Sequence, residues 1–225
     1  MKPNSRRIKN LKTLISNPIY SIDEGLSLVT KLRTAMFLES IELHVSLNIN
    51  SKNAKQQVTS DVLLPNAIKT NRRIAVFTDE INSDLIGLGA CIVGNEEILT
   101  KIRSGNIDFD ILITDQKNMP KLSSVGRILG IKGLMPSLKN GTITNNFGST
   151  IDEFGNGKIN YKTDKHGVIH LVFGKDNFSI IELKQNLLTI IESIKKNKPL
   201  GVKGKYFKSL HICTSMSPSI KLFNY

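Results

Sequence analysis

The chain has 225 residues, 40% of them hydrophobic, which is enough for one large or two small domains with real cores. Its 31 Lys and Arg residues outnumber its 19 Asp and Glu residues, giving a net charge of +12 that favours a polyanionic partner, most simply a nucleic acid. No run approaches the roughly 18 apolar residues of a membrane span, so we expect no membrane association.

The first third of the chain predicts a helix followed by a strand. Ser21 and Glu24 stand at capping-box spacing before an apolar stripe, which predicts a helix that reaches Ala35. Apolar and polar residues then alternate from Glu39 to Leu47. One face of this strand is therefore expected to be solvated or to meet a partner.

The middle of the chain has a different pattern. Three short, continuous apolar runs, 74–78, 90–94 and 110–114, are separated by helical segments, which predicts β-α-β-α-β order. Continuous apolar strands are typical of a parallel sheet that helices cover on both faces. We expect the helix at 96–103 to end at Gly105.

After this unit the alternating pattern returns. Strands are predicted at 158–162 and 168–173, and a last one at 207–213. Between them, Ser179 and Glu182 form a second capping box before a long apolar stripe that ends in lysines.

The helix-and-strand fragments at the two ends of the chain are each too small to bury a core alone, so we expect them to pack together. The predicted fold class is α/β. Residues 1–67 and 157–225 would form a discontinuous α+β base domain, and residues 68–156 an inserted three-layer, Rossmann-like α/β domain.

Parallel α/β units often bind nucleotides, but the glycines at 126, 130 and 133 give GxxxGxxG and not GxGxxG, and GxxxxGK[ST] is absent. Asp108 and Asp110 could form a metal pair or a solvated turn. No catalytic set of nucleophile, base and orienting group can be assembled from the four histidines, His44, His166, His170 and His211. We therefore predict that the protein is not an enzyme and has no cofactor, metal or small-molecule substrate.

The two cysteines, Cys91 and Cys213, lie far apart and outside any CxxC pair, so the sequence indicates neither a disulfide framework nor a zinc site. A reducing compartment fits this usage. The N-terminal residues lack the apolar core of a secretory signal, so we expect the protein to be made where it works.

The run VGRILGIKGLMPSLKNGTIT at 125–144 combines glycine, basic and proline residues in an unusual spacing. Its glycines permit positive φ, and Pro136 is expected to stop any helix begun at 127–129. A packed connection between strands and a direct ligand contact both fit. The run resembles the signature of the large-subunit ribosomal protein of the L-one family, and the resemblance extends almost end to end.

This resemblance implies a structural protein of the large ribosomal subunit that binds large-subunit rRNA at the mobile stalk. It further implies that the inserted domain helps deacylated tRNA leave the E site, and that the protein can bind its own mRNA, as bacterial members do. A free nucleic-acid-binding regulator of the same fold is the alternative, and a nucleotide-dependent enzyme comes third.

The phrases IDEFGNGKINY, HLVFGK and KGKYFKSL are most similar to plastid and cyanobacterial members. Isoleucine, asparagine and lysine are abundant, as in proteins of AT-rich genomes. We therefore predict an organelle-encoded protein of the plastid stroma, with the bacterial cytoplasm or the mitochondrion as alternatives.

Two candidate RNA contacts follow from the resemblance. In FLESIEL, Phe37 would lie beside the rRNA surface or instead anchor the core, and Ser40 and Glu42 could bond ribose hydroxyls. In TSMSP, where the family has Thr-Met-Gly-Pro, the hydroxyls of Thr214 and Ser215 and the Met216 side chain are candidates. Ser217 adds a side chain where close backbone approach can matter.

Lysine-rich segments at 158–165, 195–198 and 203–208 supply general affinity for phosphates, and we expect several of them on the edge of one sheet. Lys165, Lys203 and Lys205 are the predicted phosphate contacts. A solubilising surface is the alternative for any single lysine.

Overall fold

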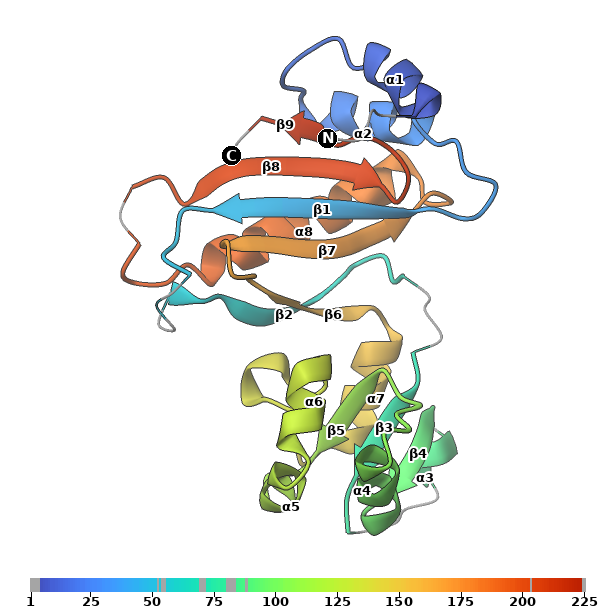
Figure 1. Cartoon of the computed structure of the whole chain (residues 1–225), viewed down its shortest axis with the longest axis vertical. Helices are drawn as coiled ribbons and strands as arrows, with labels where there is room; N and C mark the ends of the chain where they lie inside the picture. The colour runs from blue at the N-terminus through green and yellow to red at the C-terminus, as the bar shows by residue number, and fades with distance from the viewer. Residues whose placement is uncertain are drawn as a thin grey trace. The chain divides into compact units, whose positions relative to one another are not determined.

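The computed structural model describes residues 5–51, 53, 56–68, 72–79, 84–87, 89–202 and 204–223. The chain divides into two compact units (Figure 1). Unit 1 comprises Met1–Ile68 and Asn160–Tyr225, and unit 2 comprises Lys69–Ile159. The ends of the chain thus meet in one unit, and the middle forms the other. The α/β fold class predicted from the sequence is confirmed.

Unit 1 is built on a four-stranded antiparallel sheet in the order β7-β1-β8-β9. A second, two-stranded sheet pairs β2 with β6. The elements in chain order are α1 (Arg6–Thr13), α2 (Ile22–Lys31), β1 (Ser40–Leu47), β2 (Thr59–Leu63), β6 (Lys158–Lys162), β7 (Val168–Lys175), α8 (Ile180–Lys196), β8 (Phe207–Thr214) and β9 (Ile220–Leu222).

One face of the four-stranded sheet forms the core of unit 1. The odd-numbered residues of β1 are buried, and Ile41, Leu43 and Val45 are fully so, each contributing about 1.5–3 kcal/mol to folding. Helices α2 and α8 pack against this sheet and against each other (Figure 1). The even-numbered residues of β1 are only half-buried, which leaves the opposite face open.

Both predicted capping boxes are confirmed. In α2, Glu24 N donates to Ser21 Oγ at 3.4 Å and Ser21 N donates to Glu24 Oε2 at 3.2 Å. In α8, Ser179 and Glu182 make the equivalent pair at 3.3 and 2.7 Å. Each box satisfies two backbone donors at the start of its helix.

The prediction that the first helix reaches Ala35 is wrong, because α2 ends at Lys31. The backbone N–H groups of Thr34 and Ala35 donate to the carboxylate of Glu39, at 3.3 and 2.9 Å, and not to helical carbonyls. Hydrogen bonds to the Glu39 side chain therefore replace helical hydrogen bonds in this segment.

Unit 2 contains the parallel sheet predicted from the three apolar runs. Its strands are β3 (Ile74–Phe77), β4 (Ala90–Gly94) and β5 (Ile111–Thr114), in the order β4-β3-β5. The helices are α3 (Asp84–Gly87), α4 (Glu96–Arg103), α5 (Met119–Ser123), α6 (Gly126–Lys132) and α7 (Phe147–Gly155).

Helices cover both faces of this sheet, as its continuous apolar strands predict. Ala75 and Phe77 pack with residues of α4, α5 and α6 in one core cluster. Ile74 and Val76 pack with residues of α3 and α7 in a second. Unit 2 is therefore a three-layer α/β/α structure.

The glycine-rich run at 125–144 forms a packed connection in unit 2. Helix α6 ends at Gly133, which has φ of 72°, so the prediction that Pro136 ends this helix is wrong. A left-handed glycine stops the helix because it meets no Cβ penalty there. Thr114 N then donates to Thr142 O at 3.0 Å, and Thr144 N donates to Thr114 O at 2.9 Å, which ties the run to the edge of β5.

Candidate nucleic-acid interface

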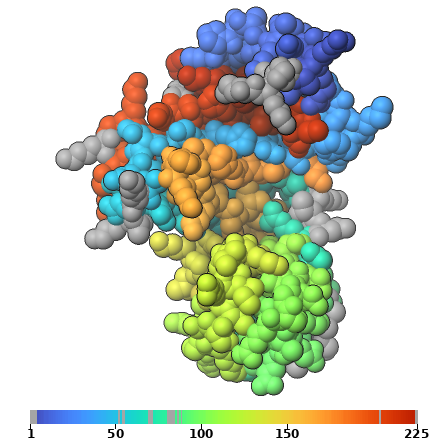
Figure 2. Space-filling view, in the orientation of Figure 1, coloured from blue at the N-terminus to red at the C-terminus, as the bar shows by residue number. Residues whose placement is uncertain are grey.

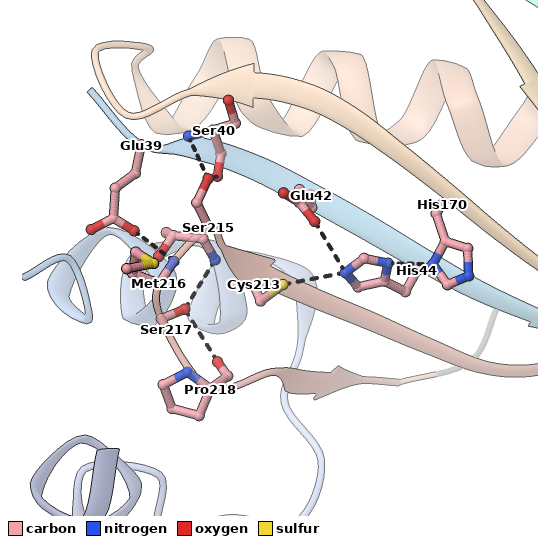
Figure 3. Close-up of polar contacts among 11 residues, drawn as sticks. Glu39, Ser40, Glu42, His44, His170, Cys213, Ser215, Met216, Ser217 and Pro218 are labelled. Atoms are coloured by element: carbon pink, nitrogen blue, oxygen red, sulfur yellow. Dashed lines mark hydrogen bonds and ion pairs between the residues drawn. The ribbon is translucent and has the colours of Figure 1, made fainter. Parts of the chain in front are cut away.

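The first candidate segment and the C-terminal turn lie side by side at one end of the four-stranded sheet, where β1 begins and β8 ends (Figure 3). Ser215 N donates to Ser40 O at 3.0 Å, and Ser40 N donates to Ser215 Oγ at 3.2 Å. Hydrogen bonds thus join two segments that are 175 positions apart in sequence. We call the residues 36–42 together with 214–218 the turn end.

The turn at 214–217 is closed by its own hydrogen bonds. Ser217 N donates to Thr214 O at 3.2 Å, and Thr214 N donates to Ser217 Oγ at 2.9 Å. The Ser217 hydroxyl in turn donates to Pro218 O at 3.2 Å. The Ser217 side chain is therefore directed into the turn (Figure 3).

Serine is compatible with the backbone at position 217. No described residue other than glycine has a positive φ, so Ser217 does not adopt the left-handed conformation that favours glycine. The effect of this added side chain on close approach of RNA stays a prediction, which Ser217→Gly tests.

A buried carboxylate holds the turn end in place. Glu39 is fully buried, and its two oxygens accept from Thr34 N, Ala35 N and Met216 N, the last at 3.2 Å. Burial by itself raises the pKa of Glu39, but the nearby Thr214 hydroxyl and these three N–H groups outweigh it, so the pKa lies below its ordinary value.

Arg7 supports the same turn from the N-terminal helix. Its Nη2 donates to Met216 O at 2.9 Å, and its Nη1 donates to Thr34 Oγ1 at 2.6 Å. Arg7 thus holds the backbone carbonyl of Met216, and Glu39 holds its backbone N–H. Sequence reasoning missed both residues; the only signal was an arginine pair at Arg6 and Arg7 and a glutamate directly before a strand.

Phe37 and Met216 at the turn end have accessible side chains, whereas Thr214 is buried, so the prediction that its hydroxyl contacts RNA is wrong. Phe37 is 52% exposed and Met216 is 46% exposed. The alternative that Phe37 anchors the core is therefore wrong. Met36 and Leu38 beside it are also exposed. An apolar group in solvent beside a rigid backbone is suited to packing against a ribose or a base.

Glu42 lies one pleat further along the open face of β1 than Ser40. It pairs in register with Cys213 of β8, and its Oε2 is 3.5 Å from His44 Nε2. Both Ser40 and Glu42 are half-buried and belong to the open face. Their position fits the prediction that polar groups of this strand meet a partner.

The candidate lysines lie elsewhere. Lys165 is in the β6–β7 connection and Lys205 in the α8–β8 connection, and both are exposed. These connections adjoin the Leu47 end of β1, since Leu47 N donates to Gly167 O and Asn48 N donates to Tyr206 O. At about 3.4 Å per residue, this end is roughly 24 Å from Ser40. Lys203 lies outside the described residues.

We call Lys165 and Lys205 with their connections the lysine end.

The expectation that several basic segments share one sheet edge is wrong. Residues 158–162 form β6 in the two-stranded sheet, and 195–196 end α8. Each basic segment also contains hydrophobic residues, and the burial of those residues assigns the segments to different elements of the fold.

Unit 2 has a cavity of about 360 Å³ at the carboxyl ends of β3 and β5. Asp79 and Asp115 are among its lining residues, and Asp79 is paired with Lys121 at 2.7 Å. Lys117 also lines this cavity, which therefore carries charges of both signs. The absence of a phosphate-binding loop stays a prediction from the missing sequence motifs.

Asp110, one member of the possible metal pair with Asp108, is instead bonded to Arg73. Asp110 accepts from Arg73 N at 3.0 Å and forms an ion pair with Arg73 Nη2 at 3.3 Å. These hydrogen bonds, first that of the Arg73 backbone, lower the pKa of Asp110. Asp110 therefore serves to join the entry of β5 to that of β3.

Comparison with known proteins identifies the family of this chain. The sequence profile described as the Ribosomal protein L1p/L10e family matches residues 29–218. The chain therefore belongs to this family, as the glycine-rich run predicts. None of the helices in the described part of the chain combines the length and hydropathy that a membrane span needs.

The similar proteins include plastid and cyanobacterial members. The chain is 48% identical to the large ribosomal subunit protein uL1c of Phaeodactylum tricornutum over 99% of this chain and 97% of that one. It is 43% identical to uL1c of Guillardia theta and 43% identical to uL1 of Prochlorococcus marinus, covering 99% of this chain and 95% of each relative. The plastid assignment made from the sequence is confirmed.

Proposed function

We propose that this protein is a structural component of the large ribosomal subunit in the plastid, and that it binds large-subunit rRNA through unit 1. Family membership supports rRNA binding in general. The observation that carries the specific assignment is the turn end, where a buried carboxylate and Arg7 fix the backbone of Met216 while the Met216 and Phe37 side chains stay exposed.

A fixed surface of this kind fits recognition of folded RNA. Proteins distinguish RNA structures by shape, by stacking on unpaired bases and by contacts to the 2′-hydroxyl. Phe37 and Met216 supply apolar contact, and Ser40, Glu42 and Ser215 supply oxygens. The buried Thr214 and the inward-bonded Ser217 help to define the backbone nearby. Because the backbone is already ordered, binding loses little conformational entropy there.

The lysine end contributes affinity of a different kind. Lys165 and Lys205 are exposed on connections, where they can neutralise phosphates and release counterions. This contribution carries no sequence information. The turn end and the lysine end together would give a site that is both selective and salt-dependent.

Two finer assignments follow from the family resemblance. The protein would stand at the mobile stalk and assist the release of deacylated tRNA from the E site, and it would bind its own mRNA where that mRNA resembles the rRNA site. The chain would act without catalysis or cofactor, since the relatives are structural proteins of the ribosome.

Sedimentation of a plastid extract at moderate salt tests the assignment. We expect the protein to cofractionate with large subunits and to be depleted from the soluble pool. A protein found only in the soluble pool, yet able to bind RNA, would contradict the ribosomal assignment and favour the free regulator.

A further inference from the structure

The open face of the four-stranded sheet carries a group of metal-ligating side chains that RNA binding does not explain. His44 of β1 lies opposite His170 of β7 and opposite His211 of β8, so histidines occupy one row across three strands. In the next row, Glu42 lies opposite Cys213. Figure 3 shows Glu42, His44 and Cys213 converging on the same side of the sheet.

The distances within this group match a metal site. His44 Nε2 is 3.3 Å from Cys213 Sγ and 3.5 Å from Glu42 Oε2, and the ligand atoms of the three residues lie within 4.8 Å of one another. A tetrahedral zinc ion bound at about 2.0–2.3 Å separates its ligands by roughly 3.5 Å. Among the described residues, no other group of His, Cys, Asp and Glu side chains meets this criterion.

Neighbouring groups orient His44 for this role. Its Nδ1 is 2.8 Å from His170 Nδ1, so one of these two nitrogens donates to the other. His170 Nε2 is in turn 3.7 Å from Asp164 Oδ2. With its proton on Nδ1, His44 would offer a lone pair at Nε2 to a cation that Glu42 and Cys213 also bind.

We propose that Glu42, His44 and Cys213 bind a divalent cation of the zinc class, with the fourth coordination position open to water. Asp164 and His170 form the outer support that metal-bound histidines usually have. This inference does not depend on RNA binding, although Glu42 belongs to both proposals. The sequence conceals the site because its members come from two strands that are far apart in the chain.

Proton release accompanies this binding. Burial, and secondly the Glu42 charge, raise the pKa of the Cys213 thiol to about 11, so the thiol is protonated at neutral pH without a metal. Burial and the neighbouring His170 lower the pKa of His44, which keeps its imidazole neutral. A zinc ion would bind the Cys213 thiolate and release one proton to solvent.

Titration of the metal-stripped full chain with zinc chloride in a non-chelating buffer tests the proposal. We expect one zinc ion per chain with a dissociation constant of about 1 μM or lower. With cobalt chloride as a probe, we expect thiolate-to-metal charge-transfer absorption. This absorption should disappear in Cys213→Ser and persist in Cys91→Ser, because Cys91 is an exposed cysteine of unit 2 and serves as the matched control.

Two further variants separate ligation from packing. His44→Gln should weaken zinc binding by more than about 100-fold, and His170→Gln by about tenfold, since removal of an outer-shell partner typically costs 10- to 100-fold. Apparent affinity should rise by up to about tenfold per pH unit below the pKa of the thiol, because one proton is released. Thermal melts without metal establish that each variant is folded.

Alkylation of the unmodified protein needs no substitution. Zinc should protect Cys213 from iodoacetamide and leave the modification of Cys91 unchanged in the same sample, as read by mass spectrometry. The proposal is overturned if the wild-type chain takes up no zinc at tens of micromolar, if Cys213→Ser gives the same cobalt spectrum, or if zinc leaves Cys213 alkylation unaffected.

Discussion

The two ends of the four-stranded sheet in unit 1 differ in how they present charge and shape. At the turn end, a buried glutamate and Arg7 fix the backbone of Met216, and the Phe37 and Met216 side chains are exposed. At the lysine end, Lys165 and Lys205 are exposed on connections. Under the proposed function, the ordered backbone of the turn end would give selectivity and the lysines would add general affinity for phosphate.

The largest effect is expected at Glu39. Glu39→Ala leaves three backbone N–H groups without their acceptor, and we expect a loss of about 3–5 kcal/mol in the free energy of unfolding. RNA binding should fall with it, because the turn is no longer fixed. Chemical denaturation of the variant and the parent measures the change. Glu182→Ala, which removes an exposed capping-box carboxylate, is the control and should lose only about 1 kcal/mol.

The same carboxylate predicts acid sensitivity. Because the pKa of Glu39 is lowered in the folded state, its contribution to stability is fully present above the ordinary value of 4.5 and is lost as pH falls through the folded pKa. The parent should therefore lose stability below about pH 4.5, and Glu39→Gln should lose less over that window. Equal pH profiles for the two proteins would contradict this role of Glu39.

Met216→Asp should produce the largest loss of RNA affinity without unfolding. The variant removes an apolar contact and places a carboxylate against phosphate, and we expect a loss of about 2–4 kcal/mol in binding free energy. Ile131→Asp, which adds the same charge at an exposed apolar position of unit 2, should bind within about twofold of the parent. Equilibrium binding to one rRNA fragment at one salt concentration distinguishes them.

The lysine end should respond differently. Lys165→Ala with Lys205→Ala should reduce the slope of log affinity against log salt by about 0.7–0.9 for each phosphate that the protein no longer neutralises. The ratio of affinities for the rRNA fragment and for an unrelated RNA should stay nearly constant. A changed ratio with an unchanged salt slope would reverse the roles assigned to the two ends.

Ser217→Gly should have the smallest effect. Its hydroxyl closes the turn from inside, so we expect a loss of about 1 kcal/mol in stability and RNA affinity within about twofold of the parent. A gain of more than about tenfold in affinity would show that the side chain does obstruct RNA, as the glycine of the family pattern suggests.

Much of the fold could be predicted because local patterns determine it. The alternation in β1, the two capping boxes and the continuous strands of unit 2 each express a local requirement for burial or for backbone hydrogen bonds. Two helix ends were predicted wrongly. After α2, backbone N–H groups donate to the Glu39 side chain and not to helical carbonyls. Helix α6 ends at the left-handed Gly133, three residues before Pro136.

The candidate site was predicted less completely because it depends on groups that are distant in the chain. Phe37, Ser40 and the C-terminal turn were found through family resemblance, but their contact depends on the register of β1 with β8. Arg7 reaches the carbonyl of Met216 across 209 positions, and no local pattern indicates that. The Glu42, His44 and Cys213 group likewise exists only once the strands pair.

Ultraviolet crosslinking of the protein to RNA in plastids, with mass spectrometry of the crosslinked peptides and sequencing of the bound fragments, tests the central claim most directly. We predict crosslinks at Phe37 and Met216 to a single structured region of large-subunit rRNA, with weaker and less specific crosslinks at Lys165 and Lys205. Crosslinks confined to the lysine end, or spread over many unrelated RNAs, would contradict the assignment of selective RNA recognition to the turn end.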